Sequence, residues 1–454
     1  MGSGSATVLE LARILGGQNV FEPPTGSPYL TDATESRGVA GHADAIVLPG
    51  STEEVAAVLS WCYEHDVPIV PRGGGTGYAA GAVPFGGVVV ATDRLTRVRS
   101  FDPLLWRICV EAGVRTSELR RIARDGGLLF PPDPGAAEQS HIGGNIATNA
   151  GGPHAFKYGV TGGWVTGLEA VIPPGEVVTF GGAVRKDVAG YDLKSLLVGS
   201  EGTLGIVTAA WLRLIPTPET TLPVVAFYAD AEAGCAALEA VYGNGISAAA
   251  LDYLDAGALA ASGRAFPGGV PDGSGFVLLA EADGRREEAE HVRDELCNVL
   301  AEGALRVASP DVRDLWRWRN GVAFAVASVL GGKVSEDIVV PVDRLAETVR
   351  ATIEIGARHG FEALSWGHGG DGNLHSTFLL ARDDEAARDR AHAATGDLFA
   401  FALELGGSVS GEHGLGVIKA GRAGWAPEVA ALQAAIKRTF DPKGLLNPGK
   451  KITL

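Results

Sequence analysis

Three glycine-rich segments in the first half of the chain constrain its fold more than any other feature. They span Arg72–Gly77, Ser140–Gly152 and Gly199–Gly205, and the chain has 64 glycines in 454 residues, roughly twice the average share. Glycine has no Cβ, so such segments make tight turns and let the backbone come close to a ligand. The glycines have no period of three, which excludes collagen. We therefore expect a folded chain whose backbone approaches a bound molecule.

Composition and charge exclude several classes of protein. With 46% hydrophobic and 20% charged residues, the chain is not intrinsically disordered. A net charge of −16 argues against nucleic acid as a partner, because a phosphate backbone requires a basic face. The four cysteines are too far apart for a zinc ribbon, an iron–sulfur cluster or a disulfide framework, which predicts buried thiols in a reducing compartment. They are Cys62, Cys109, Cys235 and Cys297.

The sequence predicts a cytoplasmic protein. No segment approaches the ~18 consecutive apolar residues of a membrane span, and the N-terminus lacks the basic region of a signal peptide. Association with a membrane would then occur at its periphery, through a partner.

Strand-like and helical segments alternate along the chain, which indicates an α+β or α/β fold. Ser51–Glu54 is a capping box that opens a helix. Beyond Pro216 and Pro218, the order of strands and helices is typical of a ferredoxin-like antiparallel sheet with helices on one face. We predict two main domains and a small C-terminal segment.

The first glycine-rich loop formally matches the dinucleotide fingerprint G-x-G-x-x-A at Gly75–Ala80. That fingerprint requires a helix directly after it, whereas Gly81, Pro84 and Gly86 follow here. A Rossmann fold is therefore excluded. The loop is either a phosphate cradle built from backbone N–H groups or an ordinary turn, and two further segments of the same character favour the cradle.

Four polar residues lie in two glycine-rich turns of the second half. His368 and His375 are seven residues apart across a predicted hairpin, and Glu412 and His413 follow later. Two imidazoles and a carboxylate suit a divalent first-row metal, with His413 left as a base. A single histidine in such a loop is more often structural, so only the four residues together predict a metal site.

Arg317 and Arg319 lie on a predicted helix. The simple interpretation places either one on a solvated face. An arginine that turns inward could instead hold a carboxylate with two parallel hydrogen bonds.

Together these motifs resemble the FAD-linked D-2-hydroxy acid dehydrogenases of the vanillyl-alcohol-oxidase superfamily, a branch with D-lactate dehydrogenase, the glycolate oxidase flavoprotein subunit and D-2-hydroxyglutarate dehydrogenase. The resemblance implies a vanillyl-alcohol-oxidase type FAD-binding domain and a ferredoxin-like substrate domain. The implied parts are an N-terminal segment (1–42), the FAD-binding domain (43–218), the substrate domain (219–405) and a C-terminal segment (406–454) that packs on the FAD domain.

The resemblance also implies roles for individual residues. His368, His375 and Glu412 would hold a metal, with zinc ranked ahead of manganese and iron, and would contact substrate together with Arg319. His413 would be the catalytic base. The glycine loop has no histidine for a covalent tether, so FAD would be non-covalent. The implied cofactor-binding residues are Pro71, Arg72, Gly73, Gly74, Gly75, Thr76, Gly77, Pro134, Gly135, Ser140, Gly143, Gly144, Asn145, Asn149, Glu201, Gly205, Ile206 and Asn447.

The implied reaction is oxidation of a D-2-hydroxy acid to the 2-keto acid. The reduced flavin would be reoxidised by an electron-transfer flavoprotein, an iron–sulfur subunit or a quinone; a homodimer is left open. Two alternatives are a flavoprotein subunit of a multi-subunit glycolate oxidase and an alkyl-glycerone-phosphate-synthase-like transferase, which needs no metal.

One departure from the family bears on the substrate. Hydroxyglutarate-specific relatives carry a lysine where Ser335 stands, although Lys333 is two residues away, and Asn320 replaces a common glutamate. Both differences weaken a dicarboxylate substrate and leave lactate, glycolate or a larger D-2-hydroxy acid open.

Overall fold

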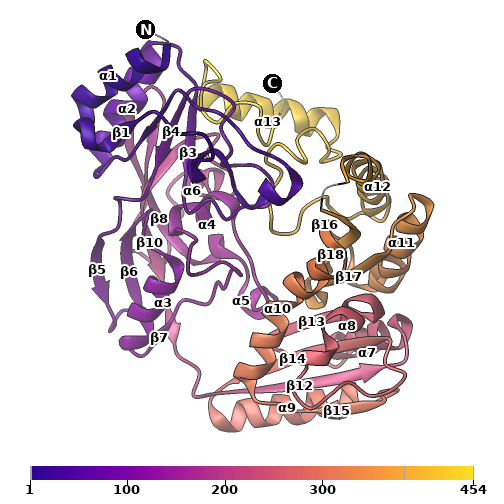
Figure 1. Cartoon of the computed structure of the whole chain (residues 1–454). Coiled ribbons are helices and arrows are strands. Elements are labelled where there is room, and N and C mark those ends of the chain that lie inside the picture. The colour runs from indigo at the N-terminus through magenta and orange to yellow at the C-terminus, as the bar shows by residue number, and fades with distance from the viewer. Residues whose placement is uncertain (1–2, 383, 453–454) are drawn as a thin grey trace. The chain divides into compact units, whose positions relative to one another are not determined.

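The computed structural model describes residues 3–382 and 384–452 and divides the chain into two compact units (Figure 1). The first unit comprises residues 1–151, 160–216 and 412–454, and the second comprises 152–159 and 217–411. This division differs from the predicted one: residues 1–42 join most of 43–218 in one unit, residues 152–159 and 217–218 belong to the second unit, and the later boundary falls after Gly411.

A four-stranded sheet forms the first part of the first unit. Its order is β1-β2-β4-β3, with β2, β4 and β3 parallel and β1 antiparallel to β2. Two helices cover one face, where side chains of α1 and α2 form one buried core with the strands. The predicted capping box is confirmed, because the Ser51 hydroxyl accepts from the Glu54 N–H at 3.2 Å. The bounds are α1 Ser3–Leu15, α2 Thr52–Glu64, β1 Val20–Phe21, β2 Ala45–Val47, β3 Ile69–Arg72 and β4 Val88–Ala91.

An antiparallel five-stranded sheet forms the second part, in the order β5-β6-β10-β8-β9. Its strands are β5 Val98–Asp102, β6 Arg107–Glu111, β8 Val165–Ile172, β9 Glu176–Gly181 and β10 Ile206–Arg213. The other elements of this unit are α3 Thr116–Asp125, α4 Ile142–Thr148, α6 Leu193–Leu197, α13 Pro427–Phe440 and the pair β7 Leu128–Leu129 with β11 Ile215–Pro216.

The glycine-rich segments differ in local structure. Residues 73–87 are all described and contain no helix, which confirms that the dinucleotide fingerprint is only formal. The long stretch from Pro131 to Gly163 is more regular than its composition suggests, because it contains α4 and α5 (Ala155–Tyr158). Glycine and asparagine are weak helix formers, so sequence propensity alone favours a loop there.

A seven-stranded antiparallel sheet organises the second unit, in the order β15-β12-β14-β13-β17-β18-β16. The first four strands and their helices follow the predicted ferredoxin-like pattern, which the sheet then extends by three strands. The strands are β12 Thr220–Tyr228, β13 Ala250–Asp255, β14 Phe276–Gly284, β15 Arg306–Ala308, β16 Gly331–Val339, β17 Ala363–His368 and β18 Asn373–Ala381.

Helices cover both faces of this sheet, which corrects the prediction that they lie on one face. Phe276 faces α7, where its ring would meet a Cβ placed on Gly234 at 2.1 Å. The next residue, Val277, points the other way into a core formed with α8 and α10. The helices of this unit are α5, α7 Ala231–Gly243, α8 Ala256–Ser262, α9 Arg286–Leu300, α10 Val312–Leu330, α11 Leu345–Arg358 and α12 Glu385–Glu404.

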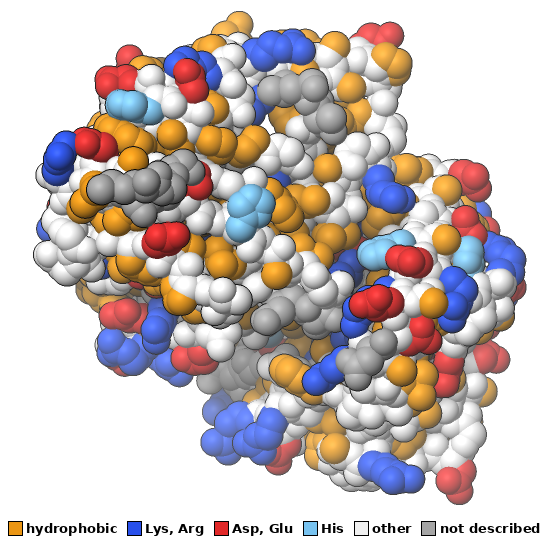
Figure 2. All heavy atoms as spheres, turned by 45° about the horizontal axis from the view of Figure 1, so that its top comes forward, with side chains coloured by type: hydrophobic (Ala, Val, Ile, Leu, Met, Phe, Trp, Pro, Cys, Tyr) orange, Lys and Arg blue, Asp and Glu red, His pale blue; other side chains and the backbone are white. Residues whose placement is uncertain are grey.

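The surface mixes charges of both signs. On the face drawn in Figure 2, acidic and basic side chains are interspersed among neutral and apolar ones. Cys62, Cys109 and Cys235 are buried and Cys297 is partly buried; burial raises the pKa of Cys62 and Cys235 to about 12. Among the described residues, no helix combines the length and the apolar character needed to cross a membrane.

Candidate functional site

The three glycine-rich segments meet inside the first unit. A Cβ placed on Gly74 would lie 2.0 Å from the backbone oxygen of Gln139 and 3.1 Å from the Cα of Ser140, so the first segment runs directly against the start of the second. The third segment is bonded to the second, because the Glu201 N–H donates to the Ala147 carbonyl at 2.7 Å. Segments that are far apart in sequence therefore form one continuous glycine-rich backbone surface.

Several side chains that were assigned to cofactor binding have structural partners. The buried guanidinium of Arg72 donates to the carbonyl oxygens of Thr31 (2.6 Å) and Pro28 (2.7 Å), which ties β3 to the N-terminal segment. Asn145 donates its side-chain amide to the Thr116 hydroxyl at 2.6 Å. In this part of the site, the backbone of 73–77 is therefore better placed to contact a phosphate than the Arg72 side chain.

The other predicted cofactor-binding residues are placed as follows. Asn149 ends α4 in the left-handed conformation, and its side chain accepts from the Gly162 N–H at 2.8 Å. Asn447 donates to the Glu201 carbonyl at 2.7 Å. The Ile206 side chain belongs to the hydrophobic core, and Pro134 and Gly135 lie in the loop after β7.

Glu201 anchors the loop that carries His413. Its carboxylate accepts from the N–H groups of Leu415 (2.9 Å) and Gly416 (2.6 Å). The His413 ring packs on Tyr78 with 4.7 Å between the ring centroids, and its Nε2 lies 3.5 Å from Oε1 of Glu412. The imidazole is thus held between an aromatic ring and a carboxylate, which is a suitable setting for a general base.

The hairpin of β17 and β18 brings the two predicted metal-ligating histidines together. Trp366 pairs with His375 across the strands, so His368 lies two residues beyond the paired position and on the same face. The ring centroids of His368 and His375 are 5.5 Å apart. The turn requires glycine at Gly372, which has φ +66° and whose Cβ would meet the Val340 carbonyl oxygen at 2.1 Å.

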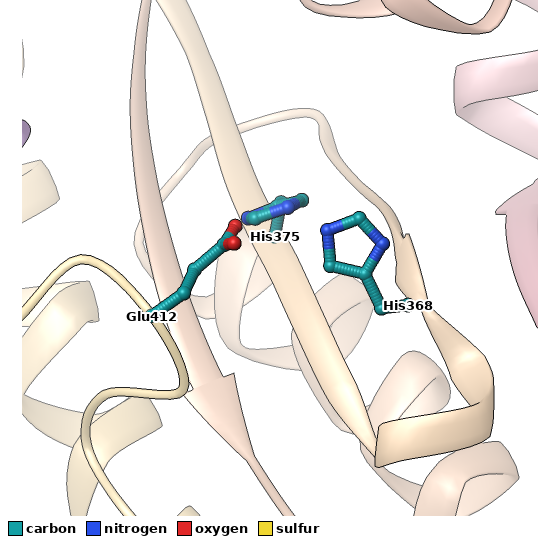
Figure 3. A group of neighbouring side chains, drawn as sticks. All are labelled: His368, His375 and Glu412. Carbon is teal, nitrogen blue, oxygen red and sulfur yellow. The ribbon is translucent and has the colours of Figure 1, made fainter. Parts of the chain in front are cut away.

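Glu412 directly follows the last residue of the second unit. The N–H of that residue, Gly411, donates to the Asp337 carboxylate on β16 at 2.8 Å. One ligand atom each of His368, His375 and Glu412 lies within 4.8 Å of the others (Figure 3). Two imidazole nitrogens and a carboxylate oxygen fit a divalent first-row metal and leave further coordination positions for a substrate.

The two arginines of α10 differ sharply in environment. Arg317 is exposed and pairs with Asp314, one turn back, at 2.7 Å. Arg319 is 200° further round the helix and only 7% exposed, so the solvated-face interpretation holds for Arg317 and is wrong for Arg319. Its Nε donates to Asp252 at 2.6 Å, while its buried Nη2 has no hydrogen-bond partner in the described structure.

Asp252 is the residue of this site that sequence reasoning missed. It is fully buried on β13, and its Oδ1 lies 2.8 Å from Nδ1 of His368 while its Oδ2 accepts from Arg319. Burial acts to raise the pKa of this carboxyl, but Arg319 and then His368 outweigh burial and lower the pKa below its ordinary value. The two contacts therefore favour the ionised form of the Asp252 carboxyl group.

A signal for Asp252 was present in the sequence. It interrupts the apolar run Ala248–Leu254, and a carboxylate inside a buried strand requires a charged or hydrogen-bonding partner. The alternation of apolar and polar residues that marks a half-buried strand is absent from this run, so periodicity alone does not reveal the strand that carries Asp252.

Comparison with known proteins agrees with the two-part organisation. The profile described as "FAD binding domain" matches residues 43–181, and that described as "FAD linked oxidases, C-terminal domain" matches 217–451. Glycolate oxidase subunit GlcD of Bacillus subtilis is 36% identical, with 97% of this chain and 95% of that protein covered. D-lactate dehydrogenase of Anaerostipes hadrus is 34% identical, with 90% and 89% covered. The structure of p-cresol methylhydroxylase with substrate bound superposes with a TM-score of 0.81 at 18% identity, covering 99% of this chain and 97% of that one.

Proposed function

Because the chain belongs to the FAD-linked oxidases, with both the FAD-binding and the C-terminal domain of that family, we propose that it oxidises a small D-2-hydroxy acid to the 2-keto acid. The observation that carries the proposal is the cluster of His368, His375 and Glu412. The names of the relatives, a glycolate oxidase subunit and a D-lactate dehydrogenase, support the substrate class.

Each residue of the cluster has a defined part in the proposal. His368, His375 and Glu412 would hold a divalent metal, with zinc ranked ahead of manganese and iron. A metal, when bound, supplies a positive charge that lowers the pKa of a hydroxyl group from ~16 by many units. Arg319 would hold the substrate carboxylate, since its buried Nη2 lacks an acceptor.

His413 would act as the base. Its Nε2 is the ring nitrogen beside the Glu412 carboxylate, and we assign to that atom the proton of the substrate hydroxyl. FAD, held without a covalent tether at the glycine-rich surface, supplies a two-electron acceptor for the hydride. The acceptor that reoxidises the flavin would be an electron-transfer flavoprotein, an iron–sulfur subunit or a quinone.

The substrate proposed is a monocarboxylic acid. The Ser335 hydroxyl is 2.8 Å from that of Thr377, and the Lys333 ammonium lies 4.6 Å from the ring centroid of Trp366. Both groups that could meet a second carboxylate thus have partners within the sheet.

Anaerobic mixing of the purified protein with a panel of D- and L-2-hydroxy acids tests the proposal. We expect one D-acid to bleach the flavin absorbance rapidly, with the effect lost after chelator treatment and restored by a divalent metal. A yellow protein that no hydroxy acid bleaches, and that binds no metal, would contradict the dehydrogenase and favour the transferase.

A second candidate is a flavoprotein subunit of a multi-subunit glycolate oxidase, which the name of the Bacillus subtilis relative favours. In that case the isolated chain would bleach on glycolate but would turn over with an artificial acceptor only, and co-purification would recover partner subunits.

A further inference from the structure

Asp252 uses both of its carboxylate oxygens to join two groups of the proposed site. Oδ1 is 2.8 Å from Nδ1 of His368, and Oδ2 is 2.6 Å from Nε of Arg319. The three residues come from β17, β13 and α10, all within the second unit. All three are at least nine-tenths buried, so water does not weaken these contacts.

The contact with His368 fixes which ring nitrogen carries the proton. The other oxygen of Asp252 is paired with the permanently charged guanidinium of Arg319, as a carboxylate would be. A carboxylate only accepts hydrogen bonds, so this pairing places the proton on Nδ1 of His368. In a neutral ring the lone pair then lies on Nε2, the nitrogen available as a metal ligand. An unassisted imidazole would divide itself between two tautomers and would be free to rotate.

The contact with Arg319 fixes the direction of the guanidinium. The group is planar and rigid, so anchoring Nε to Oδ2 also sets where Nη2 points. A buried N–H without an acceptor costs free energy, so an anion that accepted from Nη2 of Arg319 would remove that cost.

We propose that Asp252 is a positioning residue: its carboxylate orients both the proposed metal ligand His368 and the proposed substrate-binding residue Arg319. This inference rests on the proposed function. It does not touch the substrate itself. The alternative is a buried ion pair that only stabilises the sheet, and the two roles differ in what they do to metal binding.

Asp252→Asn tests the proposal, because asparagine keeps the shape but can accept from only one of the two donors. In chelator-stripped, FAD-loaded protein, we expect the Kd for Mn²⁺ alone to rise about 10–100-fold. The Kd for pyruvate, read from the flavin absorbance, should rise about tenfold, the loss expected for one charged hydrogen bond. Asp272→Asn, an exposed change in the same unit, is the matched control and should leave both constants unchanged.

A folded Asp252→Asn protein with the wild-type Kd for Mn²⁺ would overturn the proposal and leave a structural ion pair. His368→Gln separates this result from failure of the proposed function. If the wild type and His368→Gln bind Mn²⁺ equally, the metal site is absent and both proposals fall. If Asp252→Asn does not fold, ¹⁵N NMR of wild-type histidines decides, since a proton on Nε2 rather than Nδ1 of His368 would overturn the proposal.

Discussion

Two buried carboxyl groups on β13, three residues apart, have pKa values that are shifted in opposite directions. Asp252 contacts the guanidinium of Arg319 and the imidazole of His368, and the pKa of Asp252 is lowered. Asp255 accepts hydrogen bonds from backbone N–H groups, among them those of Ser365 and Ala258, and burial raises its pKa to about 7. At the scale of a single residue, the partner therefore decides whether a buried carboxyl is charged.

Asp255→Asn should change how stability depends on pH. The raised folded-state pKa means that the contribution of Asp255 is fully present below about pH 4 and is lost as the pH rises through about 7. We expect the Tm of the wild type, relative to Asp255→Asn, to fall across that window and to level off above it. Asp230→Asn, an exposed cap of α7, is the control; a Tm difference that does not vary with pH would contradict the prediction.

At the scale of elements, the candidate sites depend on segments that pack without side chains between them. The first and second glycine-rich segments touch at Gly74, and the second and third are joined by the bond from Glu201 to Ala147. The β17–β18 hairpin likewise brings His368 and His375 together, and its turn requires a glycine at Gly372. In both units, glycines thus allow backbone segments to come close enough to bring the candidate site residues together.

Gly74→Ala should push the first two glycine-rich segments apart, because the new Cβ would lie 2.0 Å from the backbone oxygen of Gln139. A backbone oxygen cannot rotate away as a side chain can, so the chain around Gln139 would have to shift. We expect FAD affinity to fall by at least about tenfold, measured by the ratio of flavin to protein absorbance after dialysis. Gly17→Ala, which meets nothing within 4 Å in the same unit, should retain FAD. Full flavin content in Gly74→Ala would show that this contact does not shape the cofactor site.

At the scale of the whole molecule, the residues of the proposed FAD site and most residues of the proposed metal site belong to different units. The contacts that join the glycine-rich segments all lie in the first unit, while His368, His375, Arg319 and Asp252 belong to the second. Glu412, the third residue of the proposed metal cluster, directly follows the boundary at Gly411 and belongs to the first unit.

Removal of metal should affect the second unit more than the first, because the second unit supplies two of the three proposed ligands. A ligand that binds only the folded state stabilises it by mass action, so chelation should lower the Tm of the second unit by several degrees. FAD should stay bound, which flavin fluorescence reports directly, since released FAD is brighter. Loss of flavin on chelation, or a calorimetric trace that chelation leaves unchanged, would contradict this prediction.

The sequence by itself determined the character of each part of this protein. Glycine-rich loops, the capping box at Ser51 and the histidine–glycine turns are local patterns whose physics does not depend on distant residues, and they predicted the absence of a Rossmann helix and the fold class. Only the tertiary structure decided which of these patterns meet. Arg319 turns inward because α10 lies over a sheet whose β13 supplies Asp252, and Arg72 serves the N-terminal segment because Pro28 and Thr31 lie beside β3. Such pairings depend on contacts between residues more than 40 positions apart, which no local periodicity encodes.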